Sequence, residues 1–220
     1  MKKLKLTIVI ALLGMASLVS AQSASLIVKG GLNMSNYYGS NLSDKNIKPG
    51  YHVGIGLDLE FLADVSFQTG LYFTSKGAEY TTKIPSGVGE VKYSVTANYI
   101  QLPIHMAYKI DIKPGTKLFI HAGPYFAYGI GGTRSIESNY TADLDKFFGE
   151  QEVNTFDKKF GYKPFDIGVG LGVGAEFGVM VIDLGWDLGL KNIARNIESM
   201  QVYKPNKKNQ SAYLSIGYKF

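Results

Sequence analysis

The sequence predicts an all-β protein with the fold of an eight-stranded antiparallel transmembrane up-and-down β-barrel. Three observations support this prediction. Eight stretches alternate between apolar residues and polar or small ones, so each strand has one apolar and one polar face. Short turns and long polar connections alternate along the chain. The first residues have the layout of an export signal, which indicates that the sheet is built outside the cytoplasm.

The N-terminal segment is predicted to be a cleavable signal peptide that covers residues 1–21. Residues 1–5 are basic, residues 6–18 form an almost unbroken apolar run, and small residues end at Ala21, after which cleavage is expected. An uncleaved membrane helix is the alternative, but the run is shorter than the roughly 20 residues that a spanning helix needs. Residues 22–220 are therefore expected to form one outer-membrane β-barrel domain.

The alternation of apolar and polar residues sets the bounds of the strands. The fourth strand changes parity near Tyr99, which predicts a β-bulge there. No helical period of comparable length appears, and only residues 143–148 are expected to form a turn of helix. The strands are expected at residues 26–35, 51–61, 65–74, 93–110, 118–130, 165–177, 180–189 and 212–220.

The connections between these strands are of two kinds. Three are tight turns, at residues 62–64, 113–115 and 178–179. The others are long and polar, and lie near residues 36–49, 81–92, 132–163 and 191–209. Short turns on one rim and long loops on the other are the plan of an outer-membrane barrel, and an even strand number closes the sheet without an edge.

A soluble calyx, with its apolar face inward, is the alternative to a membrane barrel. Lipid outside is preferred because the polar faces carry many glycines and few of the Lys and Glu that solubilise a surface. The apolar faces are rich in Leu, Ile and Val along every strand. Aromatic residues also gather near strand ends, as in an interfacial girdle, at Tyr37, Tyr38, Tyr51, Phe61, Tyr93, Tyr108, Phe165, Phe177, Tyr218 and Phe220.

Composition narrows the possible partners. The net charge of the whole chain is +5, and it falls to +2 without the three lysines of residues 1–5. The remaining lysines are scattered, so nucleic acid is not an expected partner. The sequence has no cysteine, which excludes a disulfide scaffold.

Several motifs resemble the PorT-like outer-membrane β-barrel family of Gram-negative bacteria. They are residues 98–104 (NYIQLPI), 122–125 (AGPY), 166–177 (DIGVGLGVGAEF), 188–193 (LGLKNI) and 217–220 (GYKF). The resemblance implies a small membrane barrel, hence contact with outer-membrane lipid, but no particular activity. One member is similar to proteins needed for secretion of other proteins across the outer membrane. Phe220, with Tyr218 two residues before it, looks like the signal read by the outer-membrane insertion machinery.

The inward face is expected to fill the lumen. Tyr72, Phe119, Tyr125 and Tyr213 point inward by parity, so a wide channel is disfavoured. Charges of both signs also point inward and should pair, because an unpaired charge in a narrow lumen is costly. A ring near the periplasmic rim is expected from Lys109, Lys117, Glu176 and Asp183. The predicted polar network of the lumen consists of His52, Asp58, His105, Lys109, Lys117, His121, Asp166, Glu176, Asp183 and Asp187.

His105 and His121 lie about equally far from the turn at residues 113–115, so they should be near neighbours across two strands. With a carboxylate, such a pair has the donors to hold a metal ion or move protons. A hydrogen-bonded structural pair is the favoured interpretation, because spacing assigns no third ligand. We therefore predict no metal and no cofactor.

A non-enzymatic role is predicted, because no serine-centred elbow appears and no outward histidine stands beside a serine at one rim. The long loops are the candidate for a structural, binding or export-accessory role. The longest, residues 132–163, is a possible site for a protein partner, with Phe147 and Phe148 as its anchors or as a cap on the barrel. A narrow conduit or carrier for a small or apolar ligand is the second interpretation, and a lipid-modifying enzyme the third.

Overall fold

The computed structural model describes residues 23–39, 45–83, 90–138, 153–157, 161–195 and 206–220. Within them, eight long strands form the wall of a barrel, and β2 (Lys45–Asn46), β7 (Thr133–Ser138) and β8 (Val153–Asn154) add short pairings at one end. The eight long strands are β1 (Ser23–Tyr38), β3 (Lys48–Leu62), β4 (Val65–Lys83), β5 (Glu90–Lys113), β6 (Thr116–Gly131), β9 (Phe165–Phe177), β10 (Met180–Gly189) and β11 (Lys208–Lys219).

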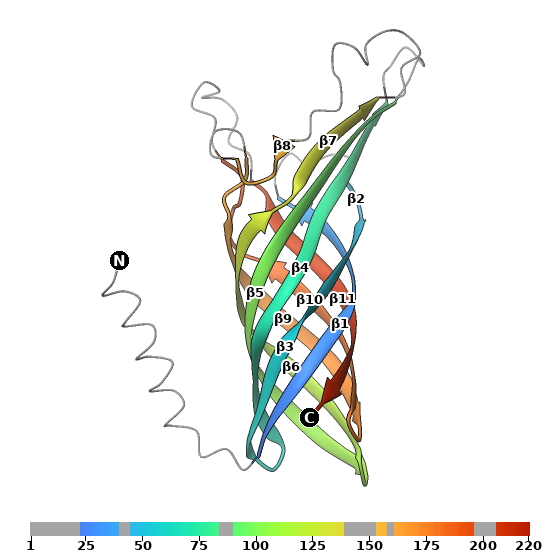
Figure 1. The fold of residues 1–220 in the computed structure, drawn as a ribbon, viewed down its shortest axis with the longest axis vertical. Coiled ribbons are helices and arrows are strands. Elements are labelled where there is room, and N and C mark those ends of the chain that lie inside the picture. Colours follow the sequence, from blue (N-terminus) through green and yellow to red (C-terminus); the bar gives the residue numbers. More distant parts are fainter. Residues whose placement is uncertain (1–22, 40–44, 84–89, 139–152, 158–160, 196–205) are drawn as a thin grey trace, which may run out of the picture.

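The eight long strands close into a ring in which every neighbour is antiparallel (Figure 1). The order follows the chain, and β1 pairs with β11 from Ile27–Lys219 to Tyr38–Lys208, which joins the first strand to the last. The predicted eight-stranded antiparallel barrel is confirmed. In the described residues, no helix has the length and apolarity needed to cross a membrane.

The two ends of the barrel differ in their connections. The turns after β3, β5 and β9 lie at one end, together with the C-terminus (Figure 1). Gly115 and Gly178 have positive φ angles of 77° and 60° there, a conformation that glycine adopts without strain. Short turns face the periplasm in outer-membrane barrels, so we call this end the periplasmic rim and the other the extracellular mouth.

The apolar face of the wall points outward. The side chains of Leu32 and Ile216 are 72% and 57% exposed, whereas those of Asp58 and Asp183, on the other face, are almost fully buried. A calyx would show the reverse, so the soluble alternative is excluded. Most of the predicted aromatic girdle is partly or well exposed, but Tyr37 is buried and Tyr93 packs against a buried cluster.

The predicted bulge near Tyr99 needs correction. A register shift does occur between Asn98 and Tyr99, but the residue skipped in the pairing, Ile130, belongs to β6. Along β5 the inward parity continues without a break, so Val95 and Ala97 are buried inside the barrel. The sequence predicted a change of parity because the inward-facing residues of this part of β5 are apolar, like those that face lipid. β4 and β5 also extend as a hairpin to Lys83 and Glu90, into a segment predicted as loop.

Candidate functional site: the lumen

The lumen has three layers between the periplasmic rim and the extracellular mouth. The first is the periplasmic cluster, an ion-pair network of Asp58, Glu60, Lys109, Glu176 and Lys219. The second is a cavity lined by three histidines. The third is the aromatic layer, which consists of Tyr37, Val95, Ala97, Tyr99, Tyr125, Phe156, Tyr162 and Ile193.

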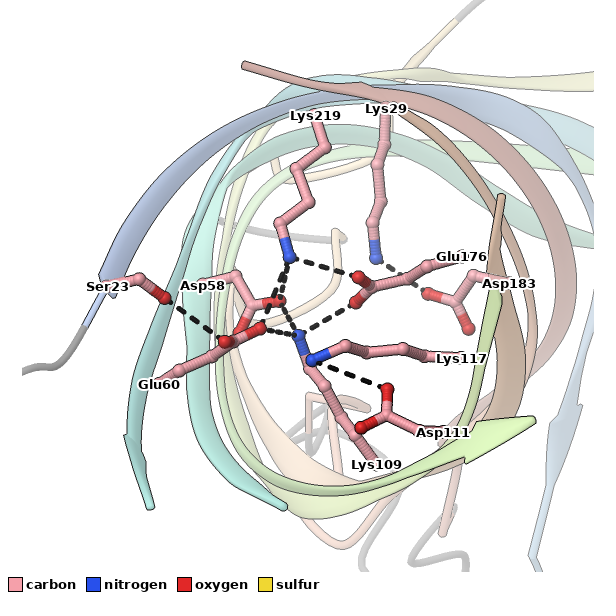
Figure 2. Close-up of polar contacts among 10 residues, drawn as sticks. All are labelled: Ser23, Lys29, Asp58, Glu60, Lys109, Asp111, Lys117, Glu176, Asp183 and Lys219. Atoms are coloured by element: carbon pink, nitrogen blue, oxygen red, sulfur yellow. Dashed lines mark hydrogen bonds and ion pairs between the residues drawn. The ribbon is translucent and has the colours of Figure 1, made fainter. Parts of the chain in front are cut away.

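Lys109 is the centre of the periplasmic cluster (Figure 2). Its buried Nζ contacts Asp58 and lies 2.8 Å from both Glu60 Oε1 and Glu176 Oε1. Lys219 approaches from the last strand, with its Nζ 3.0 Å from Glu176 Oε2 and 3.4 Å from Glu60 Oε1. Three carboxylates and two ammonium groups thus neutralise most of one another's charge across the lumen.

The predicted ring of charges has different members from this cluster. Lys109 and Glu176 belong to it, but Lys117 does not: its Nζ lies 3.8 Å from Asp111 Oδ1, outside the buried network. Asp183 belongs to the next layer, where its Oδ2 lies 2.9 Å from Lys29 Nζ. Lys219 was missed, although the parity of the last strand places it on the same face as Ser215.

Asp183 links Lys29 to the histidine pair. Its Oδ1 lies 2.9 Å from His121 Nε2, and His121 Nδ1 lies 3.0 Å from His105 Nδ1, with the two rings stacked 5.0 Å apart. If His121 donates Nε2–H to the carboxylate and stays neutral, its Nδ1 accepts from His105 Nδ1–H. His105 Nε2 is then an acceptor, and it has no partner.

The other predicted polar residues lie in the middle and upper lumen. His52 Nε2 is 2.7 Å from Ser215 Oγ. Asp187 Oδ2 accepts from Gln101 Nε2 at 2.8 Å and from Lys76 Nζ at 3.2 Å. One level higher, Asp166 Oδ2 accepts from Asn209 Nδ2 at 2.8 Å and Tyr125 OH at 3.1 Å. Each inward carboxylate named here therefore has at least one donor.

A cavity of about 70 Å³ lies in the middle layer. Four buried polar atoms of residues that line it lack a partner: both side-chain polar atoms of Asn33, His105 Nε2 and Ser211 Oγ. Residues with polar side chains line most of the cavity, which is large enough for several water molecules that would satisfy these atoms. Among the described residues, no group of three His, Cys, Asp or Glu side chains is arranged to hold a metal ion.

The aromatic layer closes the lumen below the mouth. Tyr37, Tyr99 and Tyr125 are completely buried. Tyr162 packs edge-on against Tyr37 with centroids 5.6 Å apart, and Phe156 does the same against Tyr99 at 5.4 Å. Edge-to-face contacts of this kind are favourable beyond the area they bury. The sequence analysis placed Tyr125 in the lumen but missed the other members of this layer, because it assigned the apolar faces of the strands to lipid.

The glycines of β9 make room for the rings of the lumen. A Cβ added at Gly172 would overlap the ring of His121, and one at Gly174 would overlap Phe119. A Cβ added at Gly168 would likewise overlap the ring of Tyr125, and one at Gly170 would overlap the ring of His105. The inward glycines therefore leave space for bulky neighbours, as the sequence predicts.

The C-terminal aromatics lie outside the lumen. Tyr218 and Phe220 are 46% and 68% exposed and form an edge-on pair with centroids 4.7 Å apart. They lie at the periplasmic end of the wall, because Tyr218 pairs with Met180, which directly follows the turn at residues 178–179. The predicted turn of helix at residues 143–148, with Phe147 and Phe148, lies outside the described residues.

A closed ring of eight strands, with lipid-facing apolar residues outside and a filled polar lumen, defines a small outer-membrane β-barrel. A sequence profile described as "Outer membrane protein beta-barrel domain" matches residues 20–195. The chain therefore belongs to this family and is an outer-membrane protein. No curated protein sequence matches it.

Solved structures with a similar fold come from several bacteria. OprG from Pseudomonas aeruginosa has 10% identity and a TM-score of 0.48, over 91% of this chain and 97% of that one. Neisserial surface protein A has 14% identity and a TM-score of 0.44, over 90% of this chain and 100% of that one. Ail, the attachment invasion locus protein of Yersinia pestis, was solved in complex with a heparin analogue. It has 12% identity and a TM-score of 0.41, over 90% of this chain and 100% of that one. Likenesses at this level concern the fold alone.

Proposed function

We propose that this protein is a closed, non-enzymatic outer-membrane barrel that acts through its extracellular side, as a structural, binding or export-accessory element. The observation that carries the proposal is the closure of the lumen at two levels. The periplasmic cluster bridges one end with ion pairs, and the aromatic layer fills the other with buried rings. A protein whose interior is filled in this way presents its variable chemistry in its loops.

A conduit or carrier for a small ligand is the second candidate. The cavity of the middle layer favours it, because the unpartnered polar atoms of its lining residues suit a small hydrogen-bonding ligand. At about 70 Å³ the cavity is too small for an extended ligand, and both layers would have to open for a solute to pass. Stepwise single-channel conductance is the readout for this alternative.

A lipid-modifying enzyme is the least supported candidate. Ser215 and His52 form a hydrogen-bonded pair of the kind that activates a nucleophile. Both side chains are buried inside the lumen, with the strand wall between them and the lipid. An enzyme acting on lipid would leave altered lipid detectable by mass spectrometry, and this alteration would depend on Ser215.

A protein partner at residues 132–163 is part of the proposal. The experiment is a pull-down of the full chain from mild detergent, beside a variant in which residues 139–152 are replaced by a flexible linker. We expect a defined partner with the intact chain and its loss from the variant. A linker of the same length in place of residues 84–89 provides the control, because it alters another long connection.

Heated and unheated samples on a gel should show that both variants remain folded barrels. Capture of the same partner by all three chains, or by none, would contradict a partner held at residues 132–163. The barrel and its membrane location would be untouched by that result.

The remaining proposals concern export and assembly. The layout of residues 1–21 supports a signal peptide cleaved after Ala21, and N-terminal sequencing of the membrane-borne protein tests it. The motifs quoted above support a closer relation to PorT-like barrels. The exposed pair of Tyr218 and Phe220 supports recognition by the insertion machinery, so removing Phe220 should slow assembly in vivo.

A further inference from the structure

One lysine at the extracellular mouth differs from the lysines of the lumen. Lys29, Lys76, Lys109 and Lys219 each place Nζ within 4 Å of a carboxylate oxygen. Lys207 stands just before β11 and is half-buried, yet its contacts within the described part of the chain include no carboxylate. The Lys207 ammonium is therefore partly shielded from water and has no counter-ion among the described residues.

Aromatic rings hold the Lys207 side chain in place. Its Nζ lies 5.2 Å from the ring centroid of Tyr80 and 5.4 Å from that of Tyr162. It also donates a hydrogen bond to the hydroxyl of Tyr162 at 3.2 Å. Cation–π contacts offset only part of the free-energy cost of shielding an unpaired ammonium from water.

The main chain around Lys207 is also fixed. Asn192 Oδ1 accepts from Lys207 N at 3.0 Å, and Ile193 N donates to Lys207 O at 2.8 Å. Lys163 N donates to Ile193 O at 2.8 Å, which ties the segment carrying Tyr162 to the same place. Tyr80 and Tyr162 thus contact the side chain of Lys207, and residues 192–193 hold its main chain, so the residue is fixed from three separate segments.

A second positive charge lies near Lys207. Burial and the nearby charge of Arg134 together lower the pKa of Lys207. An anion placed here would relieve the repulsion between the two cations and give the Lys207 ammonium a charged acceptor.

We propose that Lys207 and Tyr162 form a binding site for a phosphate or sulfate group at the extracellular mouth, near the charge of Arg134. Such a group offers several terminal oxygens to donors that converge from different segments, and its charge offsets more than one cation. A phosphorylated or sulfated sugar is the class of ligand, either in a lipid headgroup of the same membrane or free in solution. The assignment rests on the proposed function, because Tyr162 belongs to residues 132–163.

The test is calorimetric titration of the full chain in detergent with sodium phosphate and sodium sulfate at constant ionic strength. We expect saturable binding of at least one anion, at least tenfold weaker in Lys207→Met. The control Lys208→Met removes the same charge from the adjacent residue and should bind within twofold of the wild type. No saturable binding, or equal weakening in both variants, would overturn the site.

A second, milder variant keeps the proposal testable if Lys207→Met does not fold. Tyr162→Phe keeps the ring under Lys207 and removes only the hydroxyl, so we expect binding a few-fold weaker in a folded barrel. Unchanged affinity in Tyr162→Phe, together with unchanged affinity in a folded Lys207→Met, would also refute the proposal. Migration of unheated samples on a gel reports the folding of each variant.

Two further arms distinguish the sources of the ligand. Lipid phosphorus that co-purifies with the wild type and not with Lys207→Met indicates a headgroup of the membrane. Glucose 6-phosphate that binds more tightly than inorganic phosphate indicates a free sugar phosphate. Replacement of residues 139–152 should leave anion binding intact. A partner captured equally by the intact chain and by this variant, with anion binding retained in both, would refute only the proposed function.

Discussion

The two ends of the lumen are closed by different forces. At the periplasmic rim, Lys109 and Lys219 meet three carboxylates, and little in that cluster is apolar. At the extracellular mouth, buried tyrosines pack on one another, and Lys207 rests on rings. Charge is satisfied by charge at one end and by aromatic faces at the other.

The same barrel therefore accommodates lysine in two environments, among carboxylates at the periplasmic rim and over aromatic rings at the extracellular mouth. A lysine among buried carboxylates is needed by its partners, because its removal leaves them charged and unpaired. A lysine over rings, such as Lys207, neutralises no carboxylate in the described part of the chain. Removing a lysine should therefore have opposite consequences at the two ends, and the following experiments test that contrast.

The largest effect is expected for Lys109→Met. Its loss leaves Asp58, Glu60 and Glu176 facing one another with only Lys219 between them, at an expected cost of about 3–5 kcal/mol. Unfolding by guanidinium in lipid vesicles, followed by the fluorescence of the single tryptophan, Trp186, measures it. The control Lys117→Met removes an exposed pair and should cost less than about 1 kcal/mol. An equal loss of unfolding free energy in the two variants would show that the periplasmic cluster depends on Lys109 no more than an exposed pair depends on its lysine.

The next effect concerns packing in the middle layer. Gly172→Val places a side chain where the ring of His121 lies, so overpacking should cost about 1–3 kcal/mol although valine favours strands. Gly131→Ala is the matched control, because an added Cβ there meets nothing within 4 Å. The same unfolding assay reports both. A stable Gly172→Val barrel would mean that the histidine layer is loosely packed.

A smaller effect of opposite sign is expected for Lys207→Met at pH 7. Burial and Arg134 lower the pKa of Lys207, so the folded protein binds this proton less readily than the unfolded chain does. The stability of the wild type should therefore rise with pH from the lowered pKa up to the unfolded value near 10.4. Lys207→Met should be as stable as the wild type or up to about 1 kcal/mol more stable at pH 7.

Unfolding curves between pH 7 and pH 10 measure that difference, which should shrink as the pH rises. Lys208→Met, at the adjacent residue, is the control and should show no such trend. A stability difference that grows with pH would mean that folding raises the pKa of Lys207, and it would indicate an anionic partner in the folded protein.

The smallest effect is expected for Tyr37→Phe. The buried hydroxyl of Tyr37 has no partner, so its removal should change the free energy of unfolding by less than about 0.5 kcal/mol. In Tyr125→Phe the lost hydroxyl donates to Asp166, and a cost of about 1–2 kcal/mol is expected. A large cost for Tyr37→Phe would show that polar contacts, and not ring packing, hold the aromatic layer.

The barrel itself was predictable, because its signals are local. Alternation with period two and three tight turns fix the strand number, and they also indicate which face meets lipid along most of the wall. Prediction failed where both faces are apolar. Val95, Ala97 and Tyr99 read as lipid-facing, but they fill the lumen, because alternation alone cannot tell a membrane from a packed interior.

Ion-pair partners were harder to predict than strand neighbours. Lys117 does stand opposite Glu176 in the β6–β9 register, yet its Nζ turns to Asp111 while Glu176 reaches across the lumen to Lys109. Contacts across the lumen depend on the stagger and tilt of the closed barrel, which no local pattern encodes. The pairing of His105 with His121 was predictable because both flank one tight turn.

The claim that the lumen is closed is tested most directly by single-channel recording. The purified wild-type barrel is inserted into a planar bilayer at neutral pH, with a known porin inserted in the same way as the positive control. We expect no stepwise conductance from the folded wild-type protein, because ion pairs and rings block the lumen at both ends. Uniform conductance steps from the wild type would contradict it and favour a conduit.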